Sequence, residues 1–495
     1  MPRHYEHWIN NSESKPSTGR YLKRFSPAHG AELAEFAEGS AQDVDAAAKA
    51  ARARFEDSAS WSKLSGSARS KMLNDWANLI ERDIEQLAVV EAEEVGKPIE
   101  LARGELGWSV ELLRYAASLA WQVGGDAFTN VGEGKLGLMT REPRGVIGMI
   151  TPWNYPMVTL FQKLPYALAV GCTAVIKSSE LTSGTTFAVA RLAAEAGIPA
   201  GVINVVTGVG GVVGDAISRH PEIDMISFTG STQVGKLISK AAADTNKYVG
   251  LELGGKSANI VFDDADIDAA LDGVLLGFTL NQGEECVAGS RLLIQDTIAE
   301  SFVAQLVKRA NKLVVGLPLN NETQIGALIH EQHLEKVLEM IQSGVDQGAK
   351  LECGGSRLTQ GALEKGFFVG PTIFSSVTPE MRIFREEIFG PVLTVTTFKT
   401  QQEAVALANN TEYGLGNGVW SKDIDKALGV SEKLRSGTVY VNTYFETSPQ
   451  LPFGGYKASG VGRENGLSGL LEFTETKTTF VSMGKREYAY PSTVG

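Results

Sequence analysis

Cys286 is the residue whose surroundings best suit nucleophilic chemistry. It lies in the segment Gly283–Arg291, which is bounded by glycines and follows an apolar, helix-like run. Small neighbours leave room for a substrate beside the sulfur, although most buried cysteines are inert small hydrophobic residues. An unperturbed thiol has a pKa of about 8.5, so attack at pH 7 requires a base or a positive field. Because Glu284 and Glu285 would disfavour a thiolate, activation has to come from elsewhere in the chain.

Glu252 and Asn154 are two further residues that could take part in this chemistry. Glu252 lies at the carboxyl end of the expected strand Tyr248–Leu253, which two glycines follow, and this is where a ligand cleft forms in an α/β sheet. Its alternative role is a solvated carboxylate on a strand. Asn154 precedes an aromatic residue and a proline, a combination that is also common in turns.

The elements that must position these residues are short apolar strands that alternate with helical segments. Such strands pair in parallel through right-handed crossovers, so the pattern predicts a doubly wound, Rossmann-like α/β sheet. Its ligand loops begin at the strands' carboxyl ends, at Thr151, Lys177, Thr207, Thr229 and Gly254. The strand candidates are Gly145–Ile150, Thr173–Ile176, Val202–Val206, Met225–Phe228 and Tyr248–Leu253.

The rest of the chain divides around this sheet. The first 120 residues are expected to be mainly helical, with a capping box at Ser40 and Asp43 and an amphipathic run over Ser67–Gly96. A second α/β series has strand candidates at Ser257–Phe262, Arg291–Ile294, Val392–Phe398 and Thr438–Val441, and a helix at Thr297–Val315. The predicted domains are 1–121 with 144–253 for the first sheet, 254–453 for the second series, 122–143 with 470–495 for a β arm, and 454–469 for a return segment.

Two glycine-rich turns could bind phosphate groups. Gly208–Gly214 follows a strand and opens a helix, but its spacing differs from G-x-G-x-x-G. Gly230–Leu237 resembles the phosphate loop of nucleoside triphosphatases, yet Leu237 replaces the hydroxyl residue that would hold magnesium. The second turn still suits one pyrophosphate at a helix N-terminus.

Composition narrows the function classes. A net charge of −12 disfavours binding to nucleic acid or to an anionic membrane. The N-terminus has no apolar core for an export signal, and no apolar stretch is long enough to span a bilayer. Three scattered cysteines give no disulfide framework, which favours the cytoplasm. The histidines lack zinc-ligand spacing, so no metal is expected.

Seven motifs in one order resemble those of the aldehyde dehydrogenase superfamily. The resemblance implies a nucleotide-binding domain, a catalytic domain and an oligomerisation arm, so a homodimer or homotetramer is expected. The motifs are Thr151–Pro156, Lys177 with Glu180, Phe228–Ser231, Leu251–Lys256, Gly283–Arg291, Glu386–Pro391 and Pro452–Lys457.

The resemblance also assigns chemical roles. Cys286 would attack the carbonyl carbon of an aldehyde, and the Asn154 amide and the Cys286 backbone N–H would hold the oxyanion. Loss of hydride from the thiohemiacetal would leave a thioester, for whose hydrolysis Glu252 would activate water. Lys177 is expected to serve both the catalytic site and the cofactor.

The implied cofactor is NAD. A carboxylate at Glu180 accepts hydrogen bonds from ribose hydroxyls and repels a 2′-phosphate, so NADP is less favoured. The expected cofactor contacts are Thr151, Pro152, Trp153, Lys177, Ser179, Glu180, Gly210, Gly214, Phe228, Gly230, Ser231, Gly254, Glu387 and Phe389.

The implied substrate tunnel narrows the aldehyde only slightly. Betaine and aminoaldehyde dehydrogenases hold an ammonium group against several aromatic rings. This chain keeps Tyr155 but has Gln162, Leu280 and Phe453 where tryptophans are common, which favours a broader aldehyde range. Glu284 and Glu285, which replace the commoner residues before the cysteine, would suit a cationic head-group. The expected tunnel residues are Tyr155, Gln162, Leu280, Glu285, Val287, Glu446, Thr447 and Phe453.

Three alternatives remain beside oxidation of a broad range of aldehydes. One is an enzyme specific for betaine aldehyde or aminoaldehydes. A second is an acylating enzyme that passes the thioester to coenzyme A, against which the presence of Glu252 argues. The third is a nucleotide-binding protein that keeps the fold without turnover.

Overall fold

Five parallel strands form the centre of the first sheet, whose order is β22-β12-β11-β8-β9-β10-β2-β3. The computed structural model describes residues 2–57, 61–484 and 489–490. The central strands confirm the predicted doubly wound sheet. They are β8 (Val146–Ile150), β9 (Thr173–Lys177), β10 (Ile203–Val205), β11 (Met225–Thr229) and β12 (Tyr248–Glu252).

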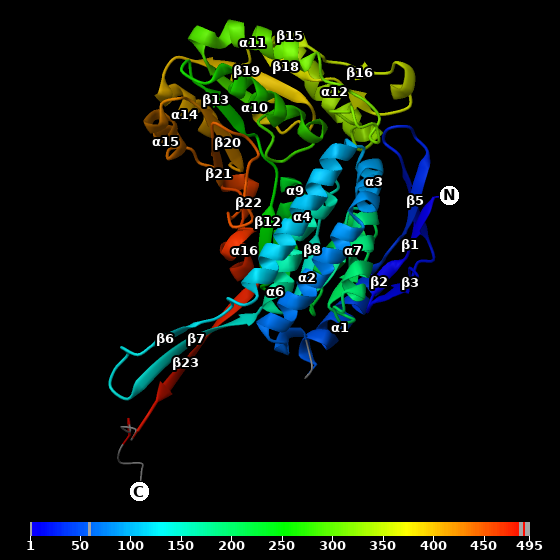
Figure 1. The fold of residues 1–495 in the computed structure, drawn as a ribbon, viewed down its shortest axis with the longest axis vertical. Helices are drawn as coiled ribbons and strands as arrows, with labels where there is room; N and C mark the ends of the chain where they lie inside the picture. The colour runs from blue at the N-terminus through cyan, green and yellow to red at the C-terminus, as the bar shows by residue number, and fades with distance from the viewer. Residues whose placement is uncertain (1, 58–60, 485–488, 491–495) are drawn as a thin grey trace.

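Helices cover both faces of this sheet (Figure 1). Ile147 and Met149 of β8 belong to one apolar cluster, whereas Val146 and Ile150 belong to the other, because successive side chains of a strand point to opposite faces. One face carries α2 (Gly66–Arg82), α3 (Ile84–Val95), α4 (Ile99–Leu119), α6 (Leu164–Val170) and α7 (Gly184–Glu195). The other carries α1 (Ala41–Glu56), α8 (Asp215–Arg219) and α9 (Thr232–Ala243).

The strand order reverses beside β8. The chain runs from β8 outward through β9 and β10, then returns to place β11 on the other side of β8. The loops that follow the carboxyl ends of β8 and β11 therefore lead away from each other. A reversal of strand order of this kind, called a topological switch point, leaves a crevice for a ligand. Asn154 follows β8, and Ser231 follows β11.

The expectation that the first 120 residues are mainly helical is wrong before Ala41. Three of the five strands there are only three residues long, too short to show an alternating pattern. One of them, β2, depends on pairing with the distant residue Val205. The Ser40 capping box is confirmed, but the run predicted over Ser67–Gly96 breaks at Asp83 into α2 and α3. The strands are β1 (Arg3–Tyr5), β2 (His7–Ile9), β3 (Ser12–Ser14), β4 (Tyr21–Phe25) and β5 (Glu32–Ala37).

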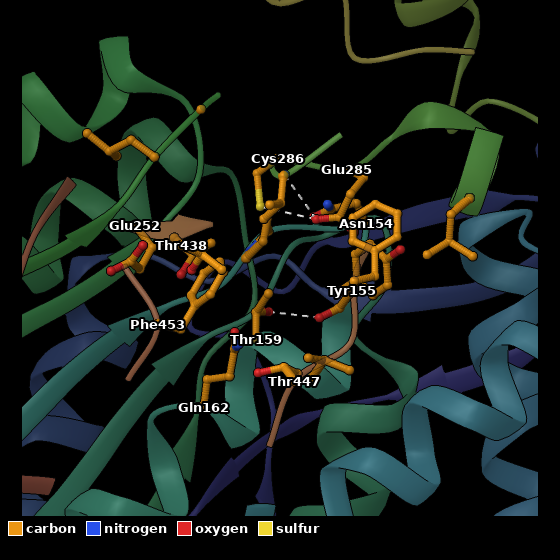
Figure 2. A pocket seen from close by; sticks show the side chains of 18 of the residues that line it. Asn154, Tyr155, Thr159, Gln162, Glu252, Glu285, Cys286, Thr438, Thr447 and Phe453 are labelled. Atoms are coloured by element: carbon orange, nitrogen blue, oxygen red, sulfur yellow. Dashed lines mark hydrogen bonds between the residues drawn. The ribbon is translucent and has the colours of Figure 1, made fainter. Parts of the chain in front are cut away.

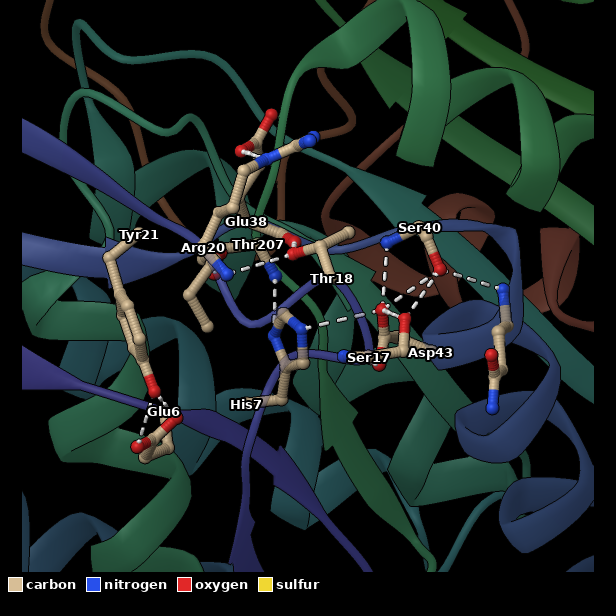
Figure 3. A network of polar contacts seen from close by, with 12 residues as sticks. Glu6, His7, Ser17, Thr18, Arg20, Tyr21, Glu38, Ser40, Asp43 and Thr207 are labelled. Carbon is tan, nitrogen blue, oxygen red and sulfur yellow. Dashed lines mark hydrogen bonds and ion pairs between the residues drawn. The ribbon is translucent and has the colours of Figure 1, made fainter.

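A buried polar network fastens this N-terminal segment to the first sheet (Figure 3). The Thr207 backbone N–H donates to His7 Nδ1 at 3.4 Å, and His7 Nε2 lies 3.9 Å from the Asp43 carboxylate. Asp43 also accepts from Ser17 and from the Ser40 backbone N–H. Burial lowers the pKa of His7, so a neutral imidazole joins β2 to the end of β10 and to α1.

The second sheet has the order β15-β18-β19-β14-β13-β20-β21. Its predicted strands are confirmed as β13 (Ala258–Val261), β14 (Arg291–Gln295), β19 (Val392–Phe398) and β21 (Thr438–Val441). The helix expected over Thr297–Val315 is α11 (Asp296–Ala310), which ends five residues earlier. The sequence analysis missed β15 (Lys350–Cys353), β18 (Thr372–Ser375) and β20 (Gly416–Trp420).

Further helices flank the second sheet or lie near the site. They are α5 (Pro156–Phe161), α10 (Ile267–Thr279), α12 (Glu331–Asp346), α13 (Arg382–Arg385), α14 (Gln401–Asn409) and α15 (Ile424–Ser431). After this sheet the chain returns to the first one, where β22 (Gly460–Val461) pairs with β12 and is followed by α16 (Gly466–Glu472).

A separate three-stranded antiparallel sheet projects from the body (Figure 1). It consists of β6 (Asp126–Phe128), β7 (Lys135–Pro143) and β23 (Thr474–Ser482), in the order β23-β7-β6. The polar segments at 122–143 and after Leu470 thus pair with each other. Residues 485–488 and 491–495 of the predicted arm lie outside the described part of the chain. The predicted domain boundaries stay a prediction.

Among the described residues, none of the helices combines the length and apolar character that crossing a membrane requires.

Candidate active site

A cavity of about 830 Å³ opens at the carboxyl ends of β8, β11 and β12 and reaches across to the second sheet. Cys286, Glu252 and Asn154, which lie far apart in the sequence, all line it. The other predicted residues that line it are Pro152, Trp153, Tyr155, Gln162, Gly230, Ser231, Gly254, Leu280, Glu285, Val287, Glu387, Phe389, Glu446, Thr447 and Phe453.

Seven predicted residues do not line this cavity: Thr151, Lys177, Ser179, Glu180, Gly210, Gly214 and Phe228. Lys177 ends β9, where its Nζ atom donates to Glu180 Oε2 at 2.6 Å. The structure therefore brings Lys177 together with Glu180 and away from the cavity that Cys286 lines.

The loop before Cys286 has an unusual backbone. Asn281, Gln282 and Gly283 all have positive φ angles, of 49°, 49° and 73°. Such conformations cost roughly 1–3 kcal/mol at each non-glycine residue and persist only where the surroundings enforce them. The Asn281 side chain supplies part of this support, since its Nδ2 atom donates to the backbone oxygens of Asn154 and Glu284, both at 3.1 Å.

Glu284 anchors this loop from within the protein. Its side chain is fully buried and accepts from the Ile329 backbone N–H at 2.9 Å and from Gln282 Nε2 at 2.9 Å. Its backbone oxygen accepts from Asn154 Nδ2 at 2.9 Å. An amide nitrogen carries two hydrogens, so Asn154 keeps its second one for a ligand in the cavity.

Glu285, in contrast, contacts the Cys286 thiol. The Sγ–H group donates to Glu285 Oε1 at 3.4 Å, and the Val287 backbone N–H donates to the same oxygen at 3.2 Å (Figure 2). Burial and the nearby Glu285 carboxylate raise the pKa of Cys286 well above its ordinary value. A free thiolate is therefore disfavoured in this structure, and Glu285 rather than Glu284 is the neighbouring carboxylate responsible.

Glu252 lines the cavity (Figure 2). It interacts with two other buried charged residues, Glu464 and Lys163. Its Oε2 atom is buried without a hydrogen-bond partner. Nearby, Lys163 donates to Glu464 and, at 2.5 Å, to Thr229 Oγ1. Burial first, and then the charge of Glu464, raise the pKa of Glu252 well above its ordinary value. The carboxylate form of Glu252 therefore appears only as the pH rises.

Gly255, in the segment after β12, allows the Cys286 backbone to approach closely. A Cβ atom at this position would lie 2.2 Å from the Cys286 carbonyl oxygen. Gly255→Ala is therefore expected to displace Cys286 and to lower kcat/KM for an aldehyde by roughly 10²-fold, as misplaced catalytic groups do. Steady-state kinetics test this. Gly429→Ala, whose Cβ would meet only Gln401 Nε2 at 4.0 Å, is the matched control, and equal kinetics of the two variants would contradict the expectation.

Tyr155 already has a cation against its ring. The Nζ atom of the fully buried Lys97 lies 4.3 Å from the ring centroid and donates to Glu105 Oε2 at 2.5 Å. Burial raises the pKa of Glu105 to about 8. One side of the ring expected to receive a substrate ammonium is thus occupied by the protein's own lysine.

Several features fit a dinucleotide. Ser231 caps α9, whose free N-terminal N–H groups suit a pyrophosphate. Thr151 Oγ1 is buried without a partner. Glu387 accepts from the Gly255 N–H at 2.9 Å, and burial raises its pKa to about 7. Exposed apolar side chains on the turn after β10 and on α9 suit a planar base: Val209, Val212, Val234 and Leu237.

The sequence analysis missed several lining residues. Leu101, Glu105 and Trp108 come from α4, whose apolar face gave no sign that it reaches a ligand. His333 and Lys336 come from α12, and His333 Nε2 lies 2.7 Å from the Phe389 backbone oxygen. Tyr440 could have been found, because it lies near the end of a predicted strand.

In the described ranges, histidine, cysteine and carboxylate side chains form no group of three or more suited to hold a metal ion.

Known proteins of similar sequence and structure give a consistent picture. Residues 14–479 match the sequence profile of the aldehyde dehydrogenase family. The chain is 45% identical to a betaine aldehyde dehydrogenase of Bacillus subtilis over 92% of this chain and 93% of that protein. It is also 45% identical to aldehyde dehydrogenase 1A1 of Gallus gallus over 97% and 94% of the two chains.

Two solved structures extend the comparison. An NAD-dependent aldehyde dehydrogenase from Sinorhizobium meliloti has a TM-score of 0.97 and 45% identity, with 99% of this chain and 97% of that chain covered. A betaine aldehyde dehydrogenase from Staphylococcus aureus, in complex with NAD+, has a TM-score of 0.96 and 37% identity, with 98% and 96% covered.

Proposed function

The chain belongs to the aldehyde dehydrogenase family, and from this premise we propose that Cys286, Asn154 and Glu252 carry its NAD-dependent oxidation of an aldehyde to the acid. The observation that carries the proposal is that these three residues line one cavity, with Ser231 and Glu387 lining its cofactor side. Each of the three has the chemistry that one step requires.

In the first step, Cys286 Sγ bonds to the carbonyl carbon and the thiol proton passes to solvent water. The resulting oxyanion accepts hydrogen bonds from the free N–H of Asn154 and from the backbone N–H of Cys286. A donor of this kind stabilises the transition state by about 3–4 kcal/mol. When bound, NAD accepts the hydride that leaves the former aldehyde carbon. Cys286 then carries a thioester.

In the second step, Glu252 removes a proton from a water molecule that attacks the thioester. The carbon–sulfur bond breaks, the carboxylic acid leaves, and Cys286 is restored. Glu252 is buried beside Glu464 and Lys163. We propose that the charges of these two residues set the pH above which Glu252 can act as a base.

The proposed cofactor site extends beyond the cavity. Lys177 and Glu180 are assigned to the adenosine ribose, Ser231 to the pyrophosphate and Glu387 to the nicotinamide ribose. The carboxylate of Glu180 supports a preference for NAD over NADP, because it repels a 2′-phosphate. We also assign cofactor contacts to Thr151, Pro152, Trp153, Ser179, Gly210, Gly214, Phe228, Gly230, Gly254 and Phe389.

The proposed substrates are small aldehydes of several chemical types rather than one specific aldehyde. Lys97 already covers one side of the Tyr155 ring, which supports this range over a dedicated ammonium site. A cationic aldehyde is the second candidate, because Glu285 and Glu446 line the cavity and the Bacillus subtilis relative is a betaine aldehyde dehydrogenase.

The experiment that tests the proposal is NADH formation over a panel of aliphatic, aromatic, ω-amino and trimethylammonium aldehydes, with NADP in parallel. We expect turnover with NAD across the neutral members. A strong preference for the cationic members would replace the broad range by the second candidate, and NAD binding without turnover on any aldehyde would overturn the proposal. Product analysis with and without coenzyme A separates hydrolysis from acyl transfer.

We further propose a homodimer or homotetramer formed through the β6-β7-β23 sheet. This sheet projects from the body, and Phe128 and Phe480 on it are exposed (Figure 1). Sedimentation that shows only monomer would remove this assignment.

Cys172, Cys286 and Cys353 are free thiols, which supports a reducing, cytoplasmic location.

A further inference from the structure

The carboxylate that touches the Cys286 thiol is that of its own neighbour, Glu285. Sγ lies 3.4 Å from Glu285 Oε1, and the Val287 backbone N–H holds the same oxygen in place at 3.2 Å. Burial raises the pKa of Glu285, and hydrogen bonds from Tyr155, the Val287 N–H and the thiol oppose this rise by favouring the carboxylate. In its ionised form Glu285 has no proton to donate, and its Oε1 atom already accepts from Val287, so in this contact the thiol is the donor. The contact is therefore made by the protonated sulfur and is lost when the sulfur ionises.

The charges around Cys286 and Glu285 also favour the protonated form of the thiol. Glu252 from β12 and Glu387 from the segment after α13 both disfavour a thiolate at Cys286. Glu285 faces Lys97 from the segment before α4, but this lysine is hydrogen-bonded to Glu105. Tyr155, Tyr440 and Tyr444 also face the pair, and none of the three supplies a positive charge. Among the described residues facing Cys286, carboxylates thus predominate.

We propose that Glu285 keeps the proton on the Cys286 thiol in the resting enzyme and thereby sets the pH at which the nucleophile forms. The inference rests on the proposed function, in which Cys286 is the nucleophile. It gives Glu285 a role beyond lining the substrate tunnel. A thiol is also far less reactive than a thiolate toward oxidants, so the same contact protects the sulfur between turnovers.

The decisive variant is Glu285→Gln. An amide carries no charge and can donate an N–H to a thiolate, so both changes favour ionisation of Cys286. The measurement is the rate of Cys286 alkylation by iodoacetamide as a function of pH, followed by mass spectrometry of the peptide that contains Cys286. In this reaction Sγ bonds to carbon, iodide leaves and the thiol proton passes to the buffer.

We expect the midpoint of this profile to fall by at least one pH unit, with alkylation about tenfold faster at pH 7. The matched control is Glu284→Gln, which makes the same change at the adjacent carboxyl group. That group instead contacts Ile329 and Gln282, and burial raises its pKa to about 8. Its alkylation midpoint is expected to stay at the wild-type value. An unchanged or higher midpoint in Glu285→Gln, or an equal fall in both variants, would overturn the proposal.

Two further arms keep the outcome interpretable. If Glu285→Gln does not fold, as judged by circular dichroism, Glu285→Asp decides: its shorter side chain withdraws the oxygen from Sγ, and its midpoint is also expected to fall. An unchanged midpoint in a folded Asp variant would then overturn the inference. Alkylation requires no turnover, so it tests this inference alone. The proposed function would fail separately, if a variant without Cys286 kept dehydrogenase activity.

Discussion

Replacing Cys286 by alanine is expected to lower kcat for aldehyde oxidation by about 10⁴-fold or more, because loss of a covalent nucleophile removes the whole acyl-enzyme route. NADH formation by the purified variant measures the loss, and calorimetry with NAD shows that the cofactor site survives. The variant lacks only the Sγ atom of a residue that lines the cavity, so the fold is expected to be kept.

Cys353→Ala is the matched control for this prediction. Cys353 lies on β15, at the edge of the second sheet, and its Sγ atom is 3.7 Å from the Pro371 backbone oxygen. It does not line the cavity, so its removal is expected to leave turnover near the wild-type rate. Full turnover by Cys286→Ala would contradict the proposed mechanism at its first step.

Glu252→Gln is expected to lower kcat by about 10²–10⁴-fold, the usual contribution of a general base. The loss should fall on hydrolysis of the thioester, so one equivalent of NADH per active site is expected to form rapidly before the slow steady state. Rapid-mixing measurement of this burst, together with mass spectrometry of the acylated Cys286 peptide, tests the assignment. A wild-type kcat in this variant would exclude Glu252 as the base.

The pH profile gives an independent test of the same residue. Because the pKa of Glu252 is raised, its carboxylate form is gained as the pH rises, and the wild-type kcat should rise with it. Glu464→Gln removes a neighbouring negative charge and leaves Lys163 without its carboxylate partner, and both effects lower the pKa of Glu252. The rise in kcat is therefore expected at lower pH in Glu464→Gln and to be absent in Glu252→Gln.

The sequence predicts the parts of this protein whose signals are local. The strands from Val146 to Thr229 show as short apolar runs because both of their faces are buried. Local signals make Cys286, Glu252 and Asn154 candidates only, and their catalytic roles follow from the resemblance of the ordered motifs to the aldehyde dehydrogenase superfamily. These signals lie within a few residues of the features that they predict.

The features that the sequence does not predict depend on contacts between residues that are distant in the sequence. The three-residue strand His7–Ile9 exists because it pairs with β10, and no pattern within it predicts that pairing. Neither does sequence reveal that Lys97 lies against Tyr155, or that Glu285 faces the thiol while Glu284 faces Ile329. Adjacent, chemically identical side chains differ here only through the surroundings that the fold supplies.

The left-handed loop before Cys286 has a consequence for how the protein is made. Its supports come from Asn154, from the Ile329 backbone and from the close approach of Gly283 to Gly390, so they lie on both sides of the cysteine in the sequence. Synthesis proceeds from the N-terminus, so the last support leaves the ribosome about a hundred residues after Cys286 itself. A growing chain therefore carries this cysteine as an ordinary thiol, and the nucleophile acquires its geometry only when the second sheet has closed around it.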